Sequence, residues 1–136
     1  MTRRIAHVAV APSSVNDAVR FYELIGLSPE HVEEVEDQQV RVTMIPVGES
    51  AIELLEPTAP ESPVARFLHS RGPGIHHVSL EVDNLAELLV VLKRAGIRLI
   101  DETPRAGAGG YEIAFVHPDS TGGVLVELAE KVEAIP

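Results

Sequence analysis

The chain of 136 residues contains no cysteine and no tryptophan. Without cysteine no disulfide can form, and any metal site must take its ligands from His, Asp, Glu or Gln side chains. No hydrophobic run approaches the roughly 18 residues that a membrane-spanning helix needs, and the first residues lack the apolar segment of a signal peptide. We therefore expect a cytoplasmic protein with no membrane partner.

Basic residues are also scarce, because 11 Lys and Arg stand against 21 Asp and Glu, which gives a formal net charge of −10. Affinity for nucleic acid and for anionic lipid depends on Lys and Arg side chains that neutralise phosphates. We expect no nucleic-acid partner. The hydrophobic content of 45% instead indicates a folded globular protein, whose ligand would be a small molecule.

The sequence contains two copies of one pattern. Residues 5–27 align with residues 75–97 without a gap, and this alignment places His7 on His77. Literal identities are few, but hydrophobic residues match hydrophobic residues over most of the alignment. The chain therefore contains an internal repeat.

The ends of the two copies match as well. Residues 51–56 align with residues 125–130, which places Glu53 on Glu127. We expect a single domain, residues 1–136, built from two copies at 1–57 and 72–136. A proline-rich linker at 58–71 joins the copies.

Hydrophobic periodicity predicts the same element order in both copies, namely a strand, a helix and three further strands. The predicted strands are 5–11, 30–36, 39–47 and 50–56 in the first copy and 75–82, 97–101, 111–117 and 123–129 in the second; the predicted helices are 16–25, 63–71 and 85–95. The expected fold class is α+β, with two paired βαβββ modules. Because one helix covers only one face of each sheet, the modules are expected to form a curved sheet with a concave cup on the uncovered face.

Two adjacent histidines lie in the predicted strand at 75–82. Neighbouring residues of a strand point to opposite faces, so the two cannot share a role. His76 shares a face with Val78 and Leu80 and is expected to pack under a helix. His77 is expected to face the cup.

The same alternation places four polar residues on the cup face, at positions equivalent in the repeat: His7, Glu53, His77 and Glu127. Two imidazoles and two carboxylates suit a divalent first-row metal such as Zn²⁺, Co²⁺, Mn²⁺, Ni²⁺ or Fe²⁺. Any one of them alone is more often an ordinary polar strand residue. Their coincidence across a repeat favours a metal site, with an ordinary polar face as the alternative.

Three segments resemble one protein family. They are "AIELLEPTAPESPVARFLHSRGPGIHHVSLEVDN" (51–84), "GIRLIDETPRAGAGG" (96–110) and "FVHPDSTGGVLVEL" (115–128). Over almost the whole chain, the sequence is similar to the vicinal oxygen chelate superfamily. This superfamily includes glyoxalase I, extradiol dioxygenases and fosfomycin-resistance proteins, and the methylmalonyl-CoA epimerases are the most similar group.

The resemblance implies an acyl-CoA substrate and the interconversion of (2R)- and (2S)-methylmalonyl-CoA. It also implies that the metal ligands are His7, Glu53, His77 and Glu127 and that the metal is Co²⁺, Mn²⁺, Zn²⁺ or Ni²⁺. It also implies a homodimer. The C2 proton lies between a thioester and a carboxylate, and a metal bound to both groups would neutralise the enolate charge.

Epimerisation needs a base on each side of C2. Glu127 is the first choice, and its repeat mate Glu53 could address the opposite face. Some epimerases carry a Glu in the strand after a Gln-Gly-Val turn, but this chain has Val42 there and Gln39 in place of the glycine. The second base is then Glu53, a metal-bound water or another residue.

Two other functions fit the same residues. Glyoxalase I would use the same fold and metal with a glutathione hemithioacetal, and a resistance protein of the superfamily would bind a small molecule without catalysis.

Several further residues have either a ligand-binding or an ordinary interpretation. Arg105, Lys93 and Arg94 are CoA phosphate anchors or solvated charges; His117 contacts substrate or caps a turn; residues 107–110 close over substrate or form a hairpin turn; His31 and His69 are expected on the surface.

Overall fold

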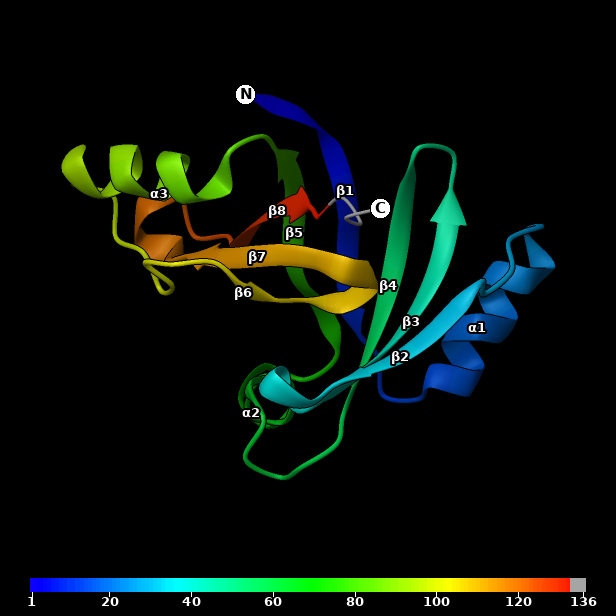
Figure 1. The fold of residues 1–136 in the computed structure, drawn as a ribbon. Coiled ribbons are helices and arrows are strands. Elements are labelled where there is room, and N and C mark those ends of the chain that lie inside the picture. Colours follow the sequence, from blue (N-terminus) through cyan, green and yellow to red (C-terminus); the bar gives the residue numbers. More distant parts are fainter. Residues whose placement is uncertain (133–136) are drawn as a thin grey trace. The chain divides into compact units, whose positions relative to one another are not determined.

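The computed structural model describes residues 1–132 of the chain. They form two compact units, one made of His7–His76 and the other of residues 1–6 with the chain from His77 onward. The chain passes between the units inside two strands, β1 (Thr2–Ala11) and β5 (Gly74–Val82). Figure 1 shows the path of the chain from blue to red.

The unit His7–His76 holds a four-stranded ladder in the order β2-β3-β4-β1, in which β1 and β4 are parallel. Its elements after β1 are α1 (Val15–Leu24), β2 (His31–Val35), β3 (Val40–Val47), β4 (Ser50–Pro57) and α2 (Pro63–Arg71). Both helices pack against β4.

The other unit holds a ladder in the order β1-β5-β8-β7-β6, in which β5 and β8 are parallel. Its elements after β5 are α3 (Leu85–Arg94), β6 (Arg105–Ala106), β7 (Tyr111–Val116) and β8 (Val126–Lys131). The first residues of β1 join this unit through ion pairs. Arg3 Nε lies 2.8 Å from Asp83 Oδ1, and Arg4 Nη2 lies 3.1 Å from Glu81 Oε1.

The repeat is visible in the register of the two parallel pairs. Val8 lies opposite Ile52 in the β1–β4 pair, and Val78 lies opposite Val126 in the β5–β8 pair. These partners are the ones that the sequence alignment makes equivalent. The predicted order of one strand, one helix and three strands is thus present in both copies.

One predicted strand is wrong. Residues 97–101 make only an isolated bridge to β7 at Leu99, and β6 takes the place of the missing strand further along the chain. A carboxylate explains the interruption, because Asp101 Oδ2 accepts a hydrogen bond from the Phe115 N–H at 2.8 Å. The Asp101 carboxylate thus accepts the hydrogen bond from the Phe115 N–H that a backbone carbonyl would accept in a continuous strand.

The N-terminus of α3 is stabilised by a residue that is distant in the sequence. Asn84 precedes the helix with a left-handed φ of 51° and makes no capping bond through its side chain. Instead Glu130 accepts hydrogen bonds from the Asn84 N–H at 2.7 Å and the Leu85 N–H at 3.1 Å. A carboxylate at this end of a helix satisfies free N–H groups and suits the helix dipole.

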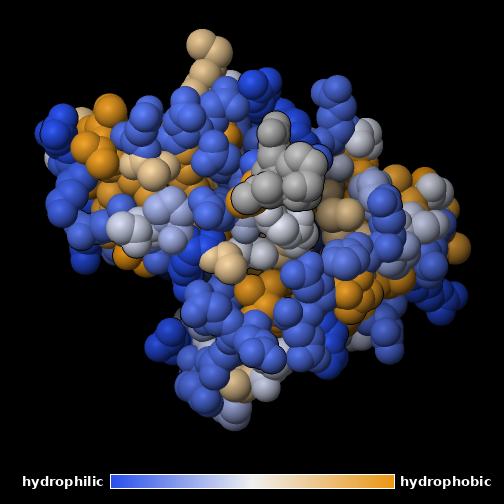
Figure 2. All heavy atoms as spheres, viewed as in Figure 1, coloured by the Kyte–Doolittle hydropathy of each residue, from blue (hydrophilic) through white to orange (hydrophobic). Residues whose placement is uncertain are grey.

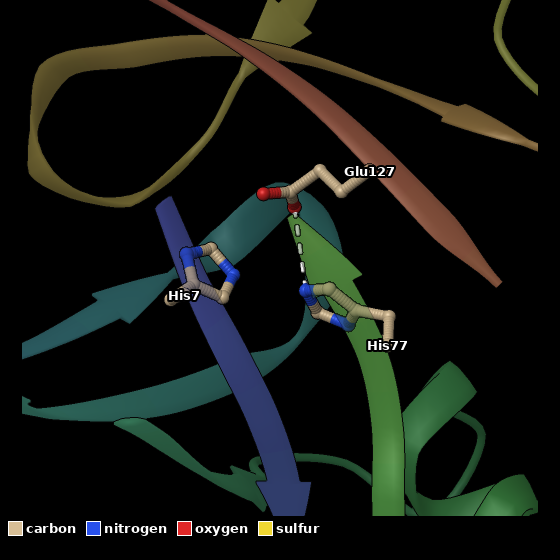
Figure 3. A group of neighbouring side chains, drawn as sticks. All are labelled: His7, His77 and Glu127. Atoms are coloured by element: carbon tan, nitrogen blue, oxygen red, sulfur yellow. Dashed lines mark ion pairs between the residues drawn. The ribbon is translucent and has the colours of Figure 1, made fainter. Parts of the chain in front are cut away.

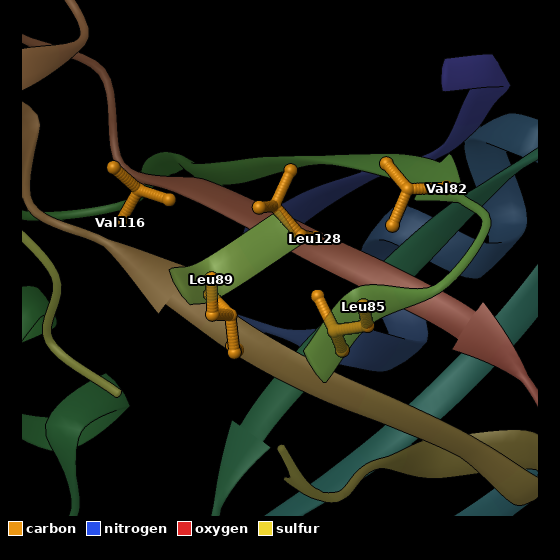
Figure 4. Close-up of a cluster of buried hydrophobic side chains, with 6 residues drawn as sticks. Val82, Leu85, Leu89, Val116 and Leu128 are labelled. Atoms are coloured by element: carbon orange, nitrogen blue, oxygen red, sulfur yellow. The ribbon is translucent and has the colours of Figure 1, made fainter. Parts of the chain in front are cut away.

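The helix-covered face of β5, β7 and β8 carries a core beneath α3. Its buried members are Val82, Leu85, Leu89, Ala114, Val116 and Leu128. Figure 4 shows five of them pointing into the space between the helix and the strands. Ile113, Phe115 and Ala129 form a second cluster, which alternation places on the opposite face of β7 and β8.

We expect Leu89→Ala to lower the free energy of unfolding by about 2–5 kcal/mol, because it leaves a cavity in this core. Leu89 is 1% exposed, whereas its neighbour Val90 is 49% exposed and serves as the control. Val90→Ala should change stability by no more than about 0.5 kcal/mol. Urea unfolding of the two variants measures the difference, and equal losses would contradict the packing described here.

Several apolar side chains lie on the surface of α1, a helix with no buried residue. Phe21, Leu24 and Ile25 are all more than half exposed. Figure 2 shows hydrophobic residues in orange over the α1 region, among otherwise mostly hydrophilic atoms.

Among the described residues, no helix has the length and apolar character that crossing a bilayer would require.

Candidate functional site

The first predicted pair of site residues lies in the unit His7–His76. His7 extends from β1 and Glu53 from the adjacent strand β4, and His7 Nδ1 lies 3.2 Å from Glu53 Oε2. Both side chains are largely withdrawn from solvent. Parallel pairing explains the contact, since Glu53 stands opposite Ala9, which shares a face with His7.

The second pair lies in the other unit and has the same composition. His77 on β5 and Glu127 on β8 approach each other with Nε2 3.6 Å from Oε2, the contact dashed in Figure 3. Their side chains are only 5% and 6% exposed. The His77 ring also meets the Phe115 ring edge to face, with centroids 5.2 Å apart.

The two pairs fit a metal chemically. Each unit brings one imidazole and one carboxylate together at positions that the repeat makes equivalent. A buried carboxylate is costly unless a cation or hydrogen bonds compensate its charge. Two nitrogen and two oxygen donors are a donor set that divalent first-row metals accept.

Glu127 has the electrostatics of an acid–base group. The pKa of its carboxyl group is raised to about 7, mainly by burial and to a smaller extent by the Asp101 carboxylate. The Ser79 hydroxyl and the Arg105 guanidinium oppose this shift. Ser79 is fully buried opposite Glu127 in the ladder, although no hydrogen bond of good geometry joins them. A carboxyl group with a pKa near neutrality can both take and return a proton.

His76 has a packing role, as strand alternation predicted. Its ring meets the Phe67 ring of α2 edge to face, with centroids 5.0 Å apart. Burial, and to a smaller extent Arg71, lowers the pKa of His76, which favours the neutral imidazole. The two adjacent histidines therefore have separate surroundings.

Other residues considered from the sequence have ordinary structural roles. His117 caps its own turn, since its Nδ1 accepts a hydrogen bond from the Asp119 N–H at 3.0 Å. His31 pairs with Glu33, Lys93 pairs with Glu102, and His69 and Arg94 are exposed. Residues 107–110 form the loop of the hairpin between β6 and β7.

Strand β3 offers no carboxylate at position 42, where the resemblance suggested one. Val42 is buried there, and Gln39 adopts the left-handed φ of 51° at the preceding turn. This conformation favours glycine, so Gln39 adopts it at some cost in strain.

A cluster formed by Asp101, Arg105 and Phe115 was not predicted from the sequence. Asp101 Oδ1 lies 3.3 Å from Arg105 Nε, and the Arg105 guanidinium carbon lies 5.8 Å from the centroid of the Phe115 ring. The spacing of four residues between Asp101 and Arg105 could have suggested an ion pair. This ion pair was not predicted because residues 97–101 were assigned to a strand.

Comparison with known proteins agrees with this architecture. Residues 6–115 match the family model of the glyoxalase/bleomycin resistance protein/dioxygenase superfamily. The Bacillus subtilis protein YqjC is 44% identical over 128 residues, which are 93% of this chain and 91% of that protein. An ethylmalonyl-CoA/methylmalonyl-CoA epimerase of Cereibacter sphaeroides is 35% identical over 133 residues, 96% of this chain and 99% of the relative.

A solved structure gives the same result. A variant of the Streptomyces coelicolor methylmalonyl-CoA epimerase in complex with 2-nitronate-propionyl-CoA is 31% identical. It superposes with a TM-score of 0.92, covering 100% of this chain and 99% of that one. The expected α+β fold of paired βαβββ modules is thereby confirmed. The chain belongs to the glyoxalase/bleomycin resistance protein/dioxygenase superfamily and has the fold of its methylmalonyl-CoA epimerases.

Proposed function

We propose that the protein is a metal-dependent epimerase that interconverts (2R)- and (2S)-methylmalonyl-CoA by moving the proton at C2. Epimerases of this name are similar to the chain over nearly its full length in sequence and in structure. The observation that carries the proposal is the presence of two buried His–Glu pairs at equivalent positions of the repeat.

The proposed ligands of one divalent ion are His7, Glu53, His77 and Glu127, and the ion is Co²⁺, Mn²⁺, Zn²⁺ or Ni²⁺. Each imidazole stands where the chain passes from one unit into the other, because His7 follows Ala6 within β1 and His77 follows His76 within β5. A bound divalent cation would stabilise the negative charge that develops on the thioester and carboxylate oxygens.

Glu127 is the proposed base on one side of C2. Its burial supports this role, because a carboxyl group with a raised pKa is better matched to proton transfer near neutral pH. Glu53 is the proposed base on the other side. Val42 is aliphatic and cannot serve, and Glu53 is the repeat mate of Glu127.

Three further features belong to the same proposal. We expect both copies of the repeat to act as one domain, because each contributes one His–Glu pair to the site. By analogy with the family, we expect a homodimer located in the cytoplasm.

The test is exchange of the C2 proton of methylmalonyl-CoA in deuterated water. Metal-loaded protein should incorporate deuterium at C2 and interconvert the two epimers, followed by NMR and mass spectrometry. Removal of metal with a chelator should lower the rate at least about 100-fold, because the charge on the enolate then loses its main stabilisation. Adding the metal back should restore it.

The rival functions give different results in the same assay. If metal-loaded protein causes no exchange but converts a glutathione hemithioacetal, the glyoxalase I alternative replaces the epimerase. If the protein binds a drug-like ligand but accelerates neither reaction, the resistance-protein alternative replaces it.

A further inference from the structure

Arg105 is the cation associated with the His77–Glu127 pair. Its guanidinium carbon lies 5.8 Å from the centroid of the Phe115 ring, and the centroid of the His77 ring lies 5.2 Å from the same point. Phe115 stands directly opposite Glu127 in the β7–β8 ladder. One aromatic side chain thus joins Arg105 to both proposed site residues of this unit.

Asp101 holds Arg105 in this position. One oxygen of the Asp101 carboxylate accepts a hydrogen bond from the Phe115 N–H at 2.8 Å, and the other lies 3.3 Å from Arg105 Nε. The Asp101 carboxylate thus connects Arg105 to the backbone of β7 at Phe115.

The hairpin is built for close contact between Arg105 and β7. Arg105 stands opposite Ile113, and a Cβ atom at Gly107 would lie 2.7 Å from Ile113 Cγ2. Glycine at this position lets β6 lie close to the Ile113 side chain of β7. The Arg105 side chain is 33% exposed as a result, whereas Lys93 and Arg98 are both 63% exposed and pair with surface carboxylates.

The chemistry of the proposed substrate suits a second cation beside the proposed metal ion. Methylmalonyl-CoA carries a carboxylate on the carbon that loses its proton, and this group must approach the carboxylate of Glu127. Two carboxylates repel each other unless positive charge lies close by, and a guanidinium would add to the charge that the metal ion supplies. Guanidinium is the side chain best suited to planar recognition of a carboxylate.

We propose that Arg105 binds the free carboxylate of the malonyl group and thereby selects 2-carboxyacyl-CoA substrates over simple acyl-CoA thioesters. This inference rests on the proposed epimerase function. It assigns Arg105 to the reacting end of the substrate rather than to the CoA phosphates.

The test compares two ligands that differ by one carboxylate, methylmalonyl-CoA and propionyl-CoA. Their dissociation constants are measured by titration calorimetry with metal-loaded wild-type protein and with Arg105→Met, which keeps an apolar stem against Phe115. Arg105→Met should raise the dissociation constant of methylmalonyl-CoA at least about 30-fold, because the bound carboxylate loses its charged partner. The affinity for propionyl-CoA should stay within about twofold.

Three further variants separate the causes. Arg98→Met removes an exposed cation and should leave both affinities unchanged. The double variant Arg105→Met/Asp101→Asn should show the same loss as the single variant, which excludes repulsion from a newly unpaired Asp101. Arg105→Lys should recover part of the preference for methylmalonyl-CoA, and it serves as the test if Arg105→Met fails to fold.

The proposal is overturned if Arg105→Met weakens both ligands equally, as an anchor for CoA phosphates would, or if it weakens neither. These outcomes leave the proposed function intact as long as wild-type protein still exchanges the C2 proton. If the wild-type protein neither prefers methylmalonyl-CoA nor exchanges its proton, the proposed function and this inference fail together.

Discussion

Glu127→Gln should lower the rate of C2 proton exchange by at least about 100-fold, since general acid–base groups typically contribute a factor of 10²–10⁴. Glutamine keeps the size of the side chain but cannot accept the proton. The substitution acts at a position that is 5% exposed and whose carboxyl pKa is raised to about 7. Exchange from the (2R) and (2S) epimers is measured separately, together with bound metal.

The control for this variant is Glu112→Gln on the neighbouring strand β7. Glu112 is exposed and outside the site, so its loss should leave exchange within about twofold of wild type. Circular dichroism shows whether both variants fold alike. Full activity in Glu127→Gln would remove Glu127 from the role of base, and a loss confined to metal binding would leave it as a ligand only.

Metal content should separate the two adjacent histidines. His77→Ala removes a proposed ligand and should reduce bound metal to a small fraction of one ion per chain. His76→Ala should keep nearly one ion per chain, because His76 packs against the Phe67 ring and is not a proposed ligand. It should instead destabilise the protein by about 1 kcal/mol through the lost ring contact.

The measurement is elemental analysis of both variants after dialysis, with thermal unfolding of each. Stoichiometric metal in His77→Ala would exclude His77 as a necessary ligand. Loss of metal in His76→Ala, with retention in His77→Ala, would reverse the assignment of the two faces.

The repeat made most of the architecture predictable. An alignment of the sequence with itself predicted equivalent partners in the two parallel strand pairs, and the register of Val8 with Ile52 and of Val78 with Val126 agrees. Alternation along β5 was enough to separate His76 from His77. Both inferences depend on periodic patterns within a strand, which the sequence displays directly.

Contacts between distant segments were not predictable in this way. The strand expected at 97–101 follows a locally correct apolar pattern, but the Asp101 side chain takes the backbone donor of Phe115. The stabilisation of α3 by Glu130 likewise joins residues 46 positions apart. The contacts of Arg105 were not predictable either, because Asp101 and Phe115 lie beside it only in the folded hairpin.

The passage of the chain between the units within β1 and β5 has a consequence for fragments of the protein. A cut in the segment 58–71 would leave two fragments, and neither would contain a complete unit, since residues 1–6 belong with the second fragment and residues 74–76 with the first. We therefore expect neither fragment to fold alone and native structure to return only when the two are mixed.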